Sequence, residues 1–188
     1  MPKTQYYCAS TLDGYIAEVD DTLGWLLEYE GSFEGDGVEP IKGSYERFYE
    51  GVGALIMGSV TYGWILGHMG EDGAWPYKGN PTWVLSSRDL PQPAGEGVDV
   101  RIVEAKVPDL HAELIAAAEG RNLWVVGGGN VASQFAEAGL LDEVLVTLVP
   151  VVLGAGKPLF ARRLPGGPMQ LVGTRTFGSG MVELRYEI

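Results

Sequence analysis

The chain contains very few of the residues that build disulfides and metal centres. Its 188 residues include one cysteine, Cys8, and two histidines, His68 and His111, which stand far apart in the sequence. A single cysteine excludes an internal disulfide and favours a cytoplasmic setting. No second histidine or cysteine stands at metal-ligand spacing, so we expect no metal site. Cys8 lies among apolar residues, where we expect an inert core thiol.

Basic residues are also scarce. The sequence has 13 Lys and Arg against 25 Asp and Glu, which gives a formal net charge of -12. Nucleic acids and anionic membranes would repel such a chain, so we expect neither as a partner. The apolar runs are far too short to cross a bilayer, and no basic and then apolar stretch resembles a secretory signal. These absences leave a small molecule as the expected partner.

The pattern that is present predicts one α/β domain over residues 1–188. The chain is 46% apolar, and its length is sufficient for a sizeable core. Strands alternate with helices and finish as an antiparallel pair, which predicts a mixed sheet covered by helices. Ser44 is expected to cap the first main helix, and residues 18–39 read as a long acidic loop. The expected strands are 6–10, 53–57, 82–86, 98–103, 122–126, 143–152, 170–177 and 182–188.

The most informative segment is a triple-glycine turn, Gly127 to Gly129, between a buried strand and a helix. Bare glycine backbone lets a phosphate approach closely, and the helix N-terminus behind it attracts negative charge. The residues from Gly127 to Ala132 fit the G-x-G-x-x-A pattern of dinucleotide-binding folds. Too few strand–helix units follow for a doubly wound domain, so the turn belongs to another fold. A tight turn that binds nothing is the alternative.

Two other strand ends carry phosphate-binding chemistry. Leu85 to Arg88 ends a strand with two hydroxyls and a guanidinium, a set that can hold the 2′-phosphate of NADP, although a solvated strand end is the alternative. Gly58 to Thr61 opens a helix with two hydroxyls and offers a second helix N-terminus to the same pyrophosphate. Simple capping by Ser59 is the alternative there.

Taken together, the motifs resemble the dihydrofolate-reductase-like superfamily, most closely the branch that contains the riboflavin-pathway pyrimidine reductase domain. The resemblance covers nearly the whole chain. It implies a three-layer α/β/α sandwich with a mixed, mostly parallel central sheet that ends in an antiparallel strand pair. The segments that carry it are Ser10 to Ala17, Met57 to Tyr62, Leu85 to Arg88, Val126 to Gly129, and Pro150 to Phe160, the last preceded by Leu141-Asp-Glu143.

The resemblance implies an NADPH-dependent reductase, and it assigns cofactor-binding residues along the chain. Ala9 and Ile16 would border the nicotinamide. The phosphate and ribose contacts would come from Gly58, Ser59, Val60, Thr61, Leu85, Ser86, Ser87, Arg88, Gly127, Gly128, Gly129, Asn130 and Val131. Ser59 departs from the family pattern, which has Arg or Lys there, and this departure weakens the case for NADPH over NADH.

The implied substrate is a small planar heterocycle of the 5-amino-6-ribosylamino-pyrimidine or dihydrofolate-like type, reduced at a C=N or C=O bond. Aromatic walls suit such a ring, and the expected substrate residues are Trp25, Phe48, Tyr49, Ile65 and Thr147. Glu30 is the expected catalytic acid, with Glu28 and ordered water as other proton sources. The branch also implies a homodimer. A non-catalytic nucleotide- or flavin-binding sensor that keeps the cofactor cleft is the alternative function.

Overall fold

A computed structural model describes residues 1–29, 41–69, 73–177 and 180–188. Its main sheet has eight strands in the order β5-β4-β3-β6-β1-β7-β10-β9, and β2 pairs with β8 in a small second sheet. The strands are β1 (Thr4–Thr11), β2 (Tyr15–Ala17), β3 (Val52–Gly58), β4 (Thr82–Leu85), β5 (Val100–Val103), β6 (Asn122–Gly127), β7 (Glu143–Val149), β8 (Lys157–Pro158), β9 (Gln170–Thr176) and β10 (Val182–Glu187).

The direction of the strands confirms the expected mixed sheet. The six strands from β5 to β7 pair in parallel, whereas β10 pairs antiparallel with both β7 and β9. β7 lies between β1 and β10 and is buried along most of its length. Its nearly continuous apolar sequence fits this position, because a central strand is covered on both faces.

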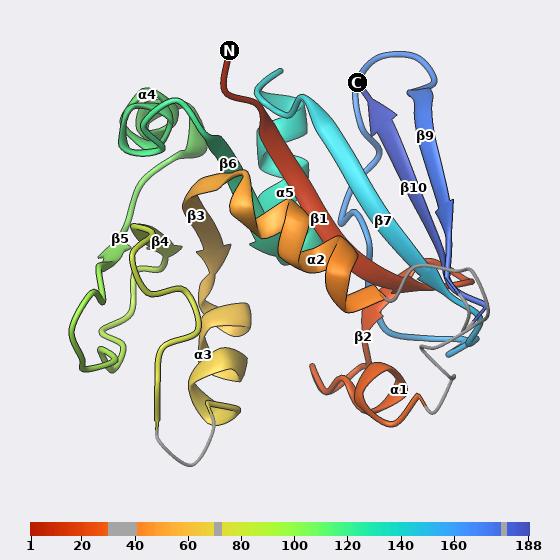
Figure 1. The fold of residues 1–188 in the computed structure, drawn as a ribbon, viewed down its shortest axis with the longest axis horizontal. Helices are drawn as coiled ribbons and strands as arrows, with labels where there is room; N and C mark the ends of the chain where they lie inside the picture. The colour runs from red at the N-terminus through yellow and green to blue at the C-terminus, as the bar shows by residue number, and fades with distance from the viewer. Residues whose placement is uncertain (30–40, 70–72, 178–179) are drawn as a thin grey trace.

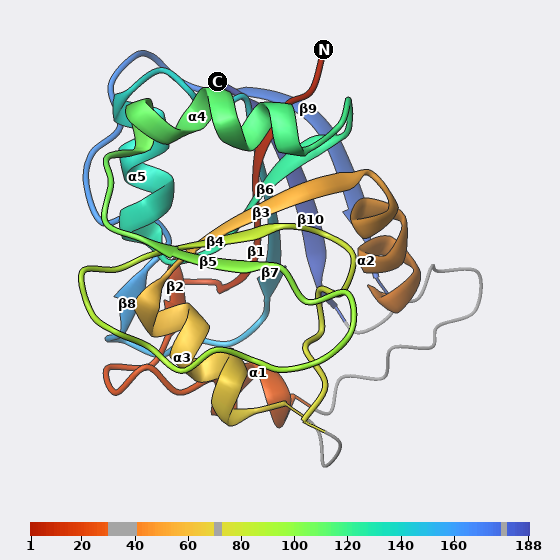
Figure 2. The same cartoon turned by 90° about the vertical axis from the view of Figure 1, so that its left-hand side faces the viewer.

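The helices complete a three-layer sandwich, as the sequence predicts (Figures 1 and 2). They are α1 (Gly24–Leu27), α2 (Ile41–Glu50), α3 (Ser59–Gly67), α4 (Val107–Ala117) and α5 (Gly129–Glu137). α4 and α5 cover one face of the sheet, where Leu114 and Phe135 are fully buried. α2 and α3 pack on the other face around an aromatic core that includes Tyr62 and Trp124.

The expectation for Ser44 was wrong. Ser44 lies inside α2, which begins at Ile41, so it does not cap that helix. Its buried hydroxyl instead donates a hydrogen bond to Glu183 on β10, at 3.2 Å. In β10, apolar residues alternate with charged ones, a pattern typical of a strand with one solvent-facing side. Glu183 on the charged side is nevertheless only 6% exposed, because α2 packs over it.

The acidic stretch that begins at residue 18 was expected to be a long loop. In its described part, up to residue 29, it contains a hydrogen-bonded turn and a short helix. Glu18 and Thr22 close a turn through their backbones at 3.0 Å, and α1 follows at Gly24–Leu27. Residues 30–40, which include the expected acid Glu30, lie outside the described residues. None of the helices in the described ranges has the length and apolar character that a bilayer crossing requires.

Candidate functional site

The three segments that the sequence singled out for phosphate binding meet where the parallel strands of the sheet end, which we call its carboxyl edge. β3, β4 and β6 are parallel neighbours, so their carboxyl ends lie side by side and the residues that follow them converge. A Cβ atom built on Gly127 would lie 3.4 Å from the Thr61 side chain, and one on Gly58 would lie 3.4 Å from Val131. The glycine turn after β6 therefore faces the first turn of α3.

Both helices at this edge start without a side-chain cap. Gly58 is the N-cap residue of α3 and Gly128 that of α5, and neither of these cap residues has a side chain to bind the N–H groups of the first turn. Simple capping by Ser59 is thereby excluded. Gly128 has a φ angle of 82°, a backbone conformation that residues with a side chain rarely adopt. Backbone N–H groups at the start of a helix attract anions when no side chain binds them, so the two helix ends suit a pyrophosphate.

Arg88 links the third segment, which follows β4, to the first turn of α3. Its Nη2 donates a hydrogen bond to the Ser59 hydroxyl at 2.8 Å, and its backbone N–H donates to the Ser86 hydroxyl at 2.9 Å. Arg88 and Ser87 are exposed, as are Val60 and Asn130 at the starts of the two helices. A guanidinium beside hydroxyls on an open rim can bind a phosphate monoester.

The segment Pro150 to Phe160 packs between the turn after β1 and the glycine turn. The Asp13 carboxylate accepts hydrogen bonds from the backbone N–H groups of Leu153 and Gly154. The Thr11 hydroxyl, which also donates to Asp13, is the main reason that the pKa of this carboxyl is lowered. A Cβ on Gly129 would lie 2.4 Å from the Pro158 carbonyl oxygen, so only glycine fits there.

This packing brings the two expected nicotinamide neighbours to the same edge. Ile16 is the middle residue of β2, and its two neighbours in that strand pair with β8. Ala9 lies near the carboxyl end of β1. Ala9 also packs against the small hydrophobic cluster that contains Trp25, Val149 and Phe177. The fifth motif of the resemblance is in direct contact with both the first and the fourth.

The expected substrate residues fall into two groups. Phe48, Tyr49 and Ile65 belong to the aromatic core under α2 and α3, where the ring of Phe48 lies 4.3 Å from that of Tyr7. Trp25 lies in the separate cluster beside Ala9. Among the described residues, the buried Trp25 Nε1 and Thr147 Oγ1 have no hydrogen-bond partner. Glu28, the alternative acid, is exposed at the end of α1.

Sequence reasoning missed the buried carboxylate nearest to Thr147. Glu183 lies directly opposite Thr147 on the neighbouring strand β10. Its place in an alternating strand made it read as a solvent-facing residue, and burial of that face is decided by α2, which is distant in the sequence.

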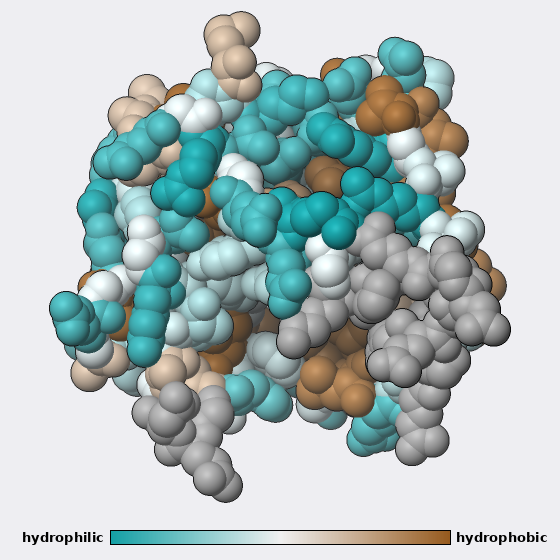
Figure 3. All heavy atoms as spheres, viewed as in Figure 1, coloured by the Kyte–Doolittle hydropathy of each residue, from teal (hydrophilic) through white to brown (hydrophobic). Residues whose placement is uncertain are grey.

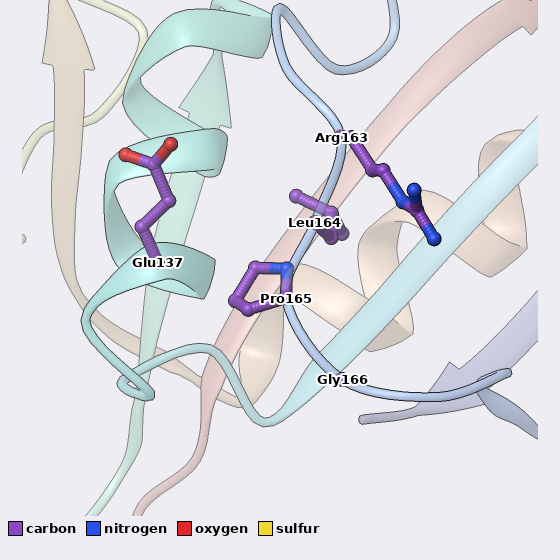
Figure 4. Close-up of a pocket in the computed structure, with 5 residues that line it drawn as sticks. All are labelled: Glu137, Arg163, Leu164, Pro165 and Gly166. Carbon is purple, nitrogen blue, oxygen red and sulfur yellow. The ribbon is translucent and has the colours of Figure 1, made fainter.

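A cavity of about 450 Å³ lies well away from this edge, between the C-terminal end of α5 and the loop that follows β8. Glu137, Arg163, Leu164, Pro165 and Gly166 line it (Figure 4). Glu137 ends α5, whereas the glycine turn begins it, so this cavity has no part in the site at the carboxyl edge.

A family model described as the RibD C-terminal domain matches residues 2–183. The chain belongs to this family. The uncharacterized protein YwjB of Bacillus subtilis is 32% identical over 184 residues, which cover 98% of this chain and 97% of YwjB. RibD-family membership agrees with the motifs that packed together above, including the segment Pro150 to Phe160.

Solved structures extend the same likeness. A protein from Shewanella sp. PV-4, whose name assigns it provisionally to riboflavin biosynthesis, superposes with a TM-score of 0.78 at 28% identity, covering 98% of each chain. Dihydrofolate reductase from Enterococcus faecalis, complexed with NADP(H) and RAB-propyl, gives a TM-score of 0.59 at 17% identity and covers 98% of this chain and 95% of its own. At that identity the second likeness establishes the fold alone, which is dihydrofolate-reductase-like.

Proposed function

We propose that this chain is an NADPH-dependent reductase that transfers a hydride to a C=N or C=O bond of a small planar heterocycle. The observation that carries the proposal is the meeting of the glycine turn, the α3 N-terminus and Arg88 at one edge of the sheet. Membership of the RibD C-terminal domain family and the NADP(H) bound to a reductase of the same fold support it.

The residues present fit such a cofactor. The uncapped first turns of α3 and α5 suit its pyrophosphate, and the narrow gap between Gly127 and Thr61 leaves no room there for a bulky side chain. Ser86, Ser87 and Arg88 would hold the 2′-phosphate. Arg88 also contacts Ser59, so its guanidinium supplies a positive charge beside the position where the family has Arg or Lys.

When bound, the cofactor would supply the hydride, and the protein would orient the reacting groups and exclude water. Ala9 and Ile16 would border the nicotinamide, and the apolar cluster around Trp25 would shield that edge from solvent. Glu30 stays our proposed proton donor. We also propose a homodimer: Leu171 and Val172 on the edge strand β9 are 49% and 42% exposed, and hydrophobic side chains gather on that part of the surface (Figure 3).

The proposal is tested by the choice between NADPH and NADH. Arg88→Ala should weaken NADPH binding by about 1.5–3 kcal/mol, the range for hydrogen bonds to charged groups, and should leave NADH binding nearly unchanged. Calorimetric titration of both cofactors measures this. Arg163→Ala, which removes another exposed arginine at the far end of α5, is the matched control and should change neither affinity. Failure of the wild-type protein to bind either cofactor would overturn the proposal.

A further inference from the structure

A cavity of about 450 Å³ lies between α2 and the sheet face that this helix only partly covers. In Figure 1, α2 crosses in front of β1, and β7, β10 and β9 lie to its right. Ser44 and Phe48 line the cavity from α2, whereas Gly51 and Asn122 line it where β3 and β6 begin. The cavity therefore reaches toward the amino ends of the parallel strands, and no described residue of its lining belongs to the proposed cofactor site.

Positive charge gathers around this cavity. Among the described residues of its lining, Arg47, Arg175 and Arg185 are basic, and Glu183 alone is acidic. The chain as a whole has a formal net charge of -12, so this balance is the reverse of the average. A local excess of arginine in an acidic protein attracts an anion to a place that the rest of the surface would not offer it.

Arg175 and Arg185 face the same space. Arg185 on β10 pairs with Gly173 on β9, and Arg175 is two residues further along β9. Residues two apart in a strand share a face, so the two arginines are diagonal neighbours, roughly 7–8 Å apart. Gly173 has no side chain, and a Cβ added there would lie 3.8 Å from the Cβ of Arg185. The glycine therefore leaves room beside the Arg185 guanidinium.

Both guanidiniums keep N–H donors that no described residue accepts. Arg185 donates through Nη2 to the two carboxylate oxygens of Glu143, at 2.7 and 2.9 Å, which leaves its Nε and Nη1. Arg175 donates through Nη1 to the Ser44 hydroxyl at 3.1 Å, which leaves its Nε and Nη2. The Glu183 carboxylate lies 3.8 Å from the same Nη1, too far for a hydrogen bond. The planar fork of N–H groups in a guanidinium matches a carboxylate or a phosphate.

Other residues of the lining are apolar. Phe48 and Leu145 line the inner part of the cavity, and Val172, which is 42% exposed, lines it on β9. Sites for small organic molecules have this size and combine apolar walls with a few polar groups that fix orientation. An inorganic anion would leave the apolar walls in contact with water, so the lining suits an organic anion better.

We propose that this cavity is a second binding site, for a small organic anion that carries a carboxylate or a phosphate group on an apolar body. The guanidiniums of Arg175 and Arg185 donate to the anionic oxygens, and the apolar body lies against Phe48 and Leu145. Glu183 opposes the anion, because its negative charge lies beside Arg175. The cavity is separate from the carboxyl edge, so this assignment does not depend on the proposed function.

NMR titration of the isotope-labelled protein, with and without NADP⁺, tests the assignment. The probes are benzoate, phenyl phosphate and benzamide, which share one ring and differ in charge. We expect saturable shifts of the amide signals of residues 173–175 and 183–185 with benzoate or phenyl phosphate, and the tighter of the two identifies the anionic group. Uncharged benzamide should cause none. The position of the shifts distinguishes this cavity from residues 127–131, whether or not the cofactor binds there.

Three variants change the charge around the cavity. Arg175→Gln removes one guanidinium and should weaken binding of the anionic probe by about tenfold or more. Glu183→Gln removes the opposing charge but keeps an oxygen for the Ser44 hydroxyl, so it should tighten binding several-fold. Arg163→Gln is the matched control, because it removes another exposed arginine, which lines the cavity of Figure 4, and it should leave the affinity unchanged.

Gly173→Val fills the space beside Arg185 without a change of charge. Its Cβ would make an ordinary contact of 3.8 Å with the Cβ of Arg185, and valine is favoured in strands. The melting temperature should therefore stay equal or rise, while the anionic probe no longer binds.

No saturable binding of either anion by the wild-type protein, equal shifts with benzamide, or an unchanged affinity in either Arg175→Gln or Gly173→Val would overturn the assignment. Val172 also lies on the proposed dimer surface, so sedimentation of the wild type and of Arg175→Gln without a probe belongs to the test. A change of oligomeric state in Arg175→Gln would assign this arginine to a contact between subunits and would overturn the anion site. Titration of each variant with NADPH tests the proposed function separately, and we expect wild-type affinity.

Discussion

At the scale of single residues, the proposed cofactor site depends on how little space lies between Gly127 and Thr61. Gly127 has an ordinary backbone conformation, unlike Gly128, where any side chain would strain the turn. An added Cβ at Gly127 would make an ordinary contact of 3.4 Å with Thr61 and would fill the gap between the two segments. Gly127 is therefore the better position for testing close approach by a phosphate.

Gly127→Ala should keep the fold and weaken NADPH binding by at least about tenfold, or 1.4 kcal/mol. Gly63→Ala is the control, because its Cβ would meet open space on α3. That change should raise stability slightly through helix propensity and leave the cofactor affinity unchanged. Thermal unfolding and NADPH titration of both variants measure these effects. If Gly127→Ala binds NADPH as the wild type does, the glycine turn does not approach the phosphates.

At the scale of elements, the short helix α1 holds Trp25 beside the proposed nicotinamide edge. Trp25 and Trp124 differ in their indole N–H groups: that of Trp124 donates to the Tyr7 carbonyl at 3.1 Å, whereas that of Trp25 has no partner among the described residues. A buried donor without a partner lowers the stability of the fold, because it has lost its hydrogen bonds to water, and it is available to a ligand. The two tryptophans therefore make a matched pair for mutation.

Trp25→Phe should cost less stability than Trp124→Phe, which also loses a buried hydrogen bond worth about 1 kcal/mol. The ligand response should show the opposite order. NADPH should raise the melting temperature of Trp124→Phe as much as that of the wild type, and that of Trp25→Phe by less. Thermal unfolding with and without NADPH gives both comparisons. A full NADPH response in Trp25→Phe would remove α1 from the site.

The elements also show which features the sequence could predict. β3, β6 and β7 are apolar runs that end at glycine or proline, so their positions follow from local pattern within a few residues. The glycine turn and Arg88 were predictable because each directly follows a strand end. The burial of Ser44 and Glu183 was not, since it arises where α2 crosses a strand about 140 residues later in the chain.

At the scale of the whole molecule, the motif Leu141-Asp-Glu143 closes the edge of the sheet opposite the site. Glu143 is fully buried, and its carboxylate binds Lys3, Gln5 and Arg185. Burial alone would raise the pKa of this carboxyl, but the hydrogen bonds from Arg185, Lys3 and Gln5 outweigh it and lower the pKa. The network ties the first strand of the chain to its last, so this motif has a structural role here.

The lowered pKa of Glu143 fixes the direction of a pH dependence. Its stabilising contribution is present above the unfolded-state value of about 4.3 and is lost as the pH falls through the lower folded-state value. Glu143→Gln should therefore unfold more easily at pH 7 and lose less stability than the wild type on acidification below about pH 4. The cost at pH 7 should be roughly 3 kcal/mol or less, since Lys3 and Arg185 stay partly exposed. Urea unfolding at several pH values checks this, and equal pH slopes would contradict it.

Hydrogen exchange of the intact protein with and without NADPH tests the central claim most directly, that three strand ends form one cofactor site. The account predicts that NADPH slows exchange together in residues 58–61, 86–88 and 127–131, because one ligand covers all three segments. Exchange in residues 163–166, beside the cavity of Figure 4, should stay unchanged. Protection of only one of the three segments, or protection confined to residues 163–166, would contradict the account.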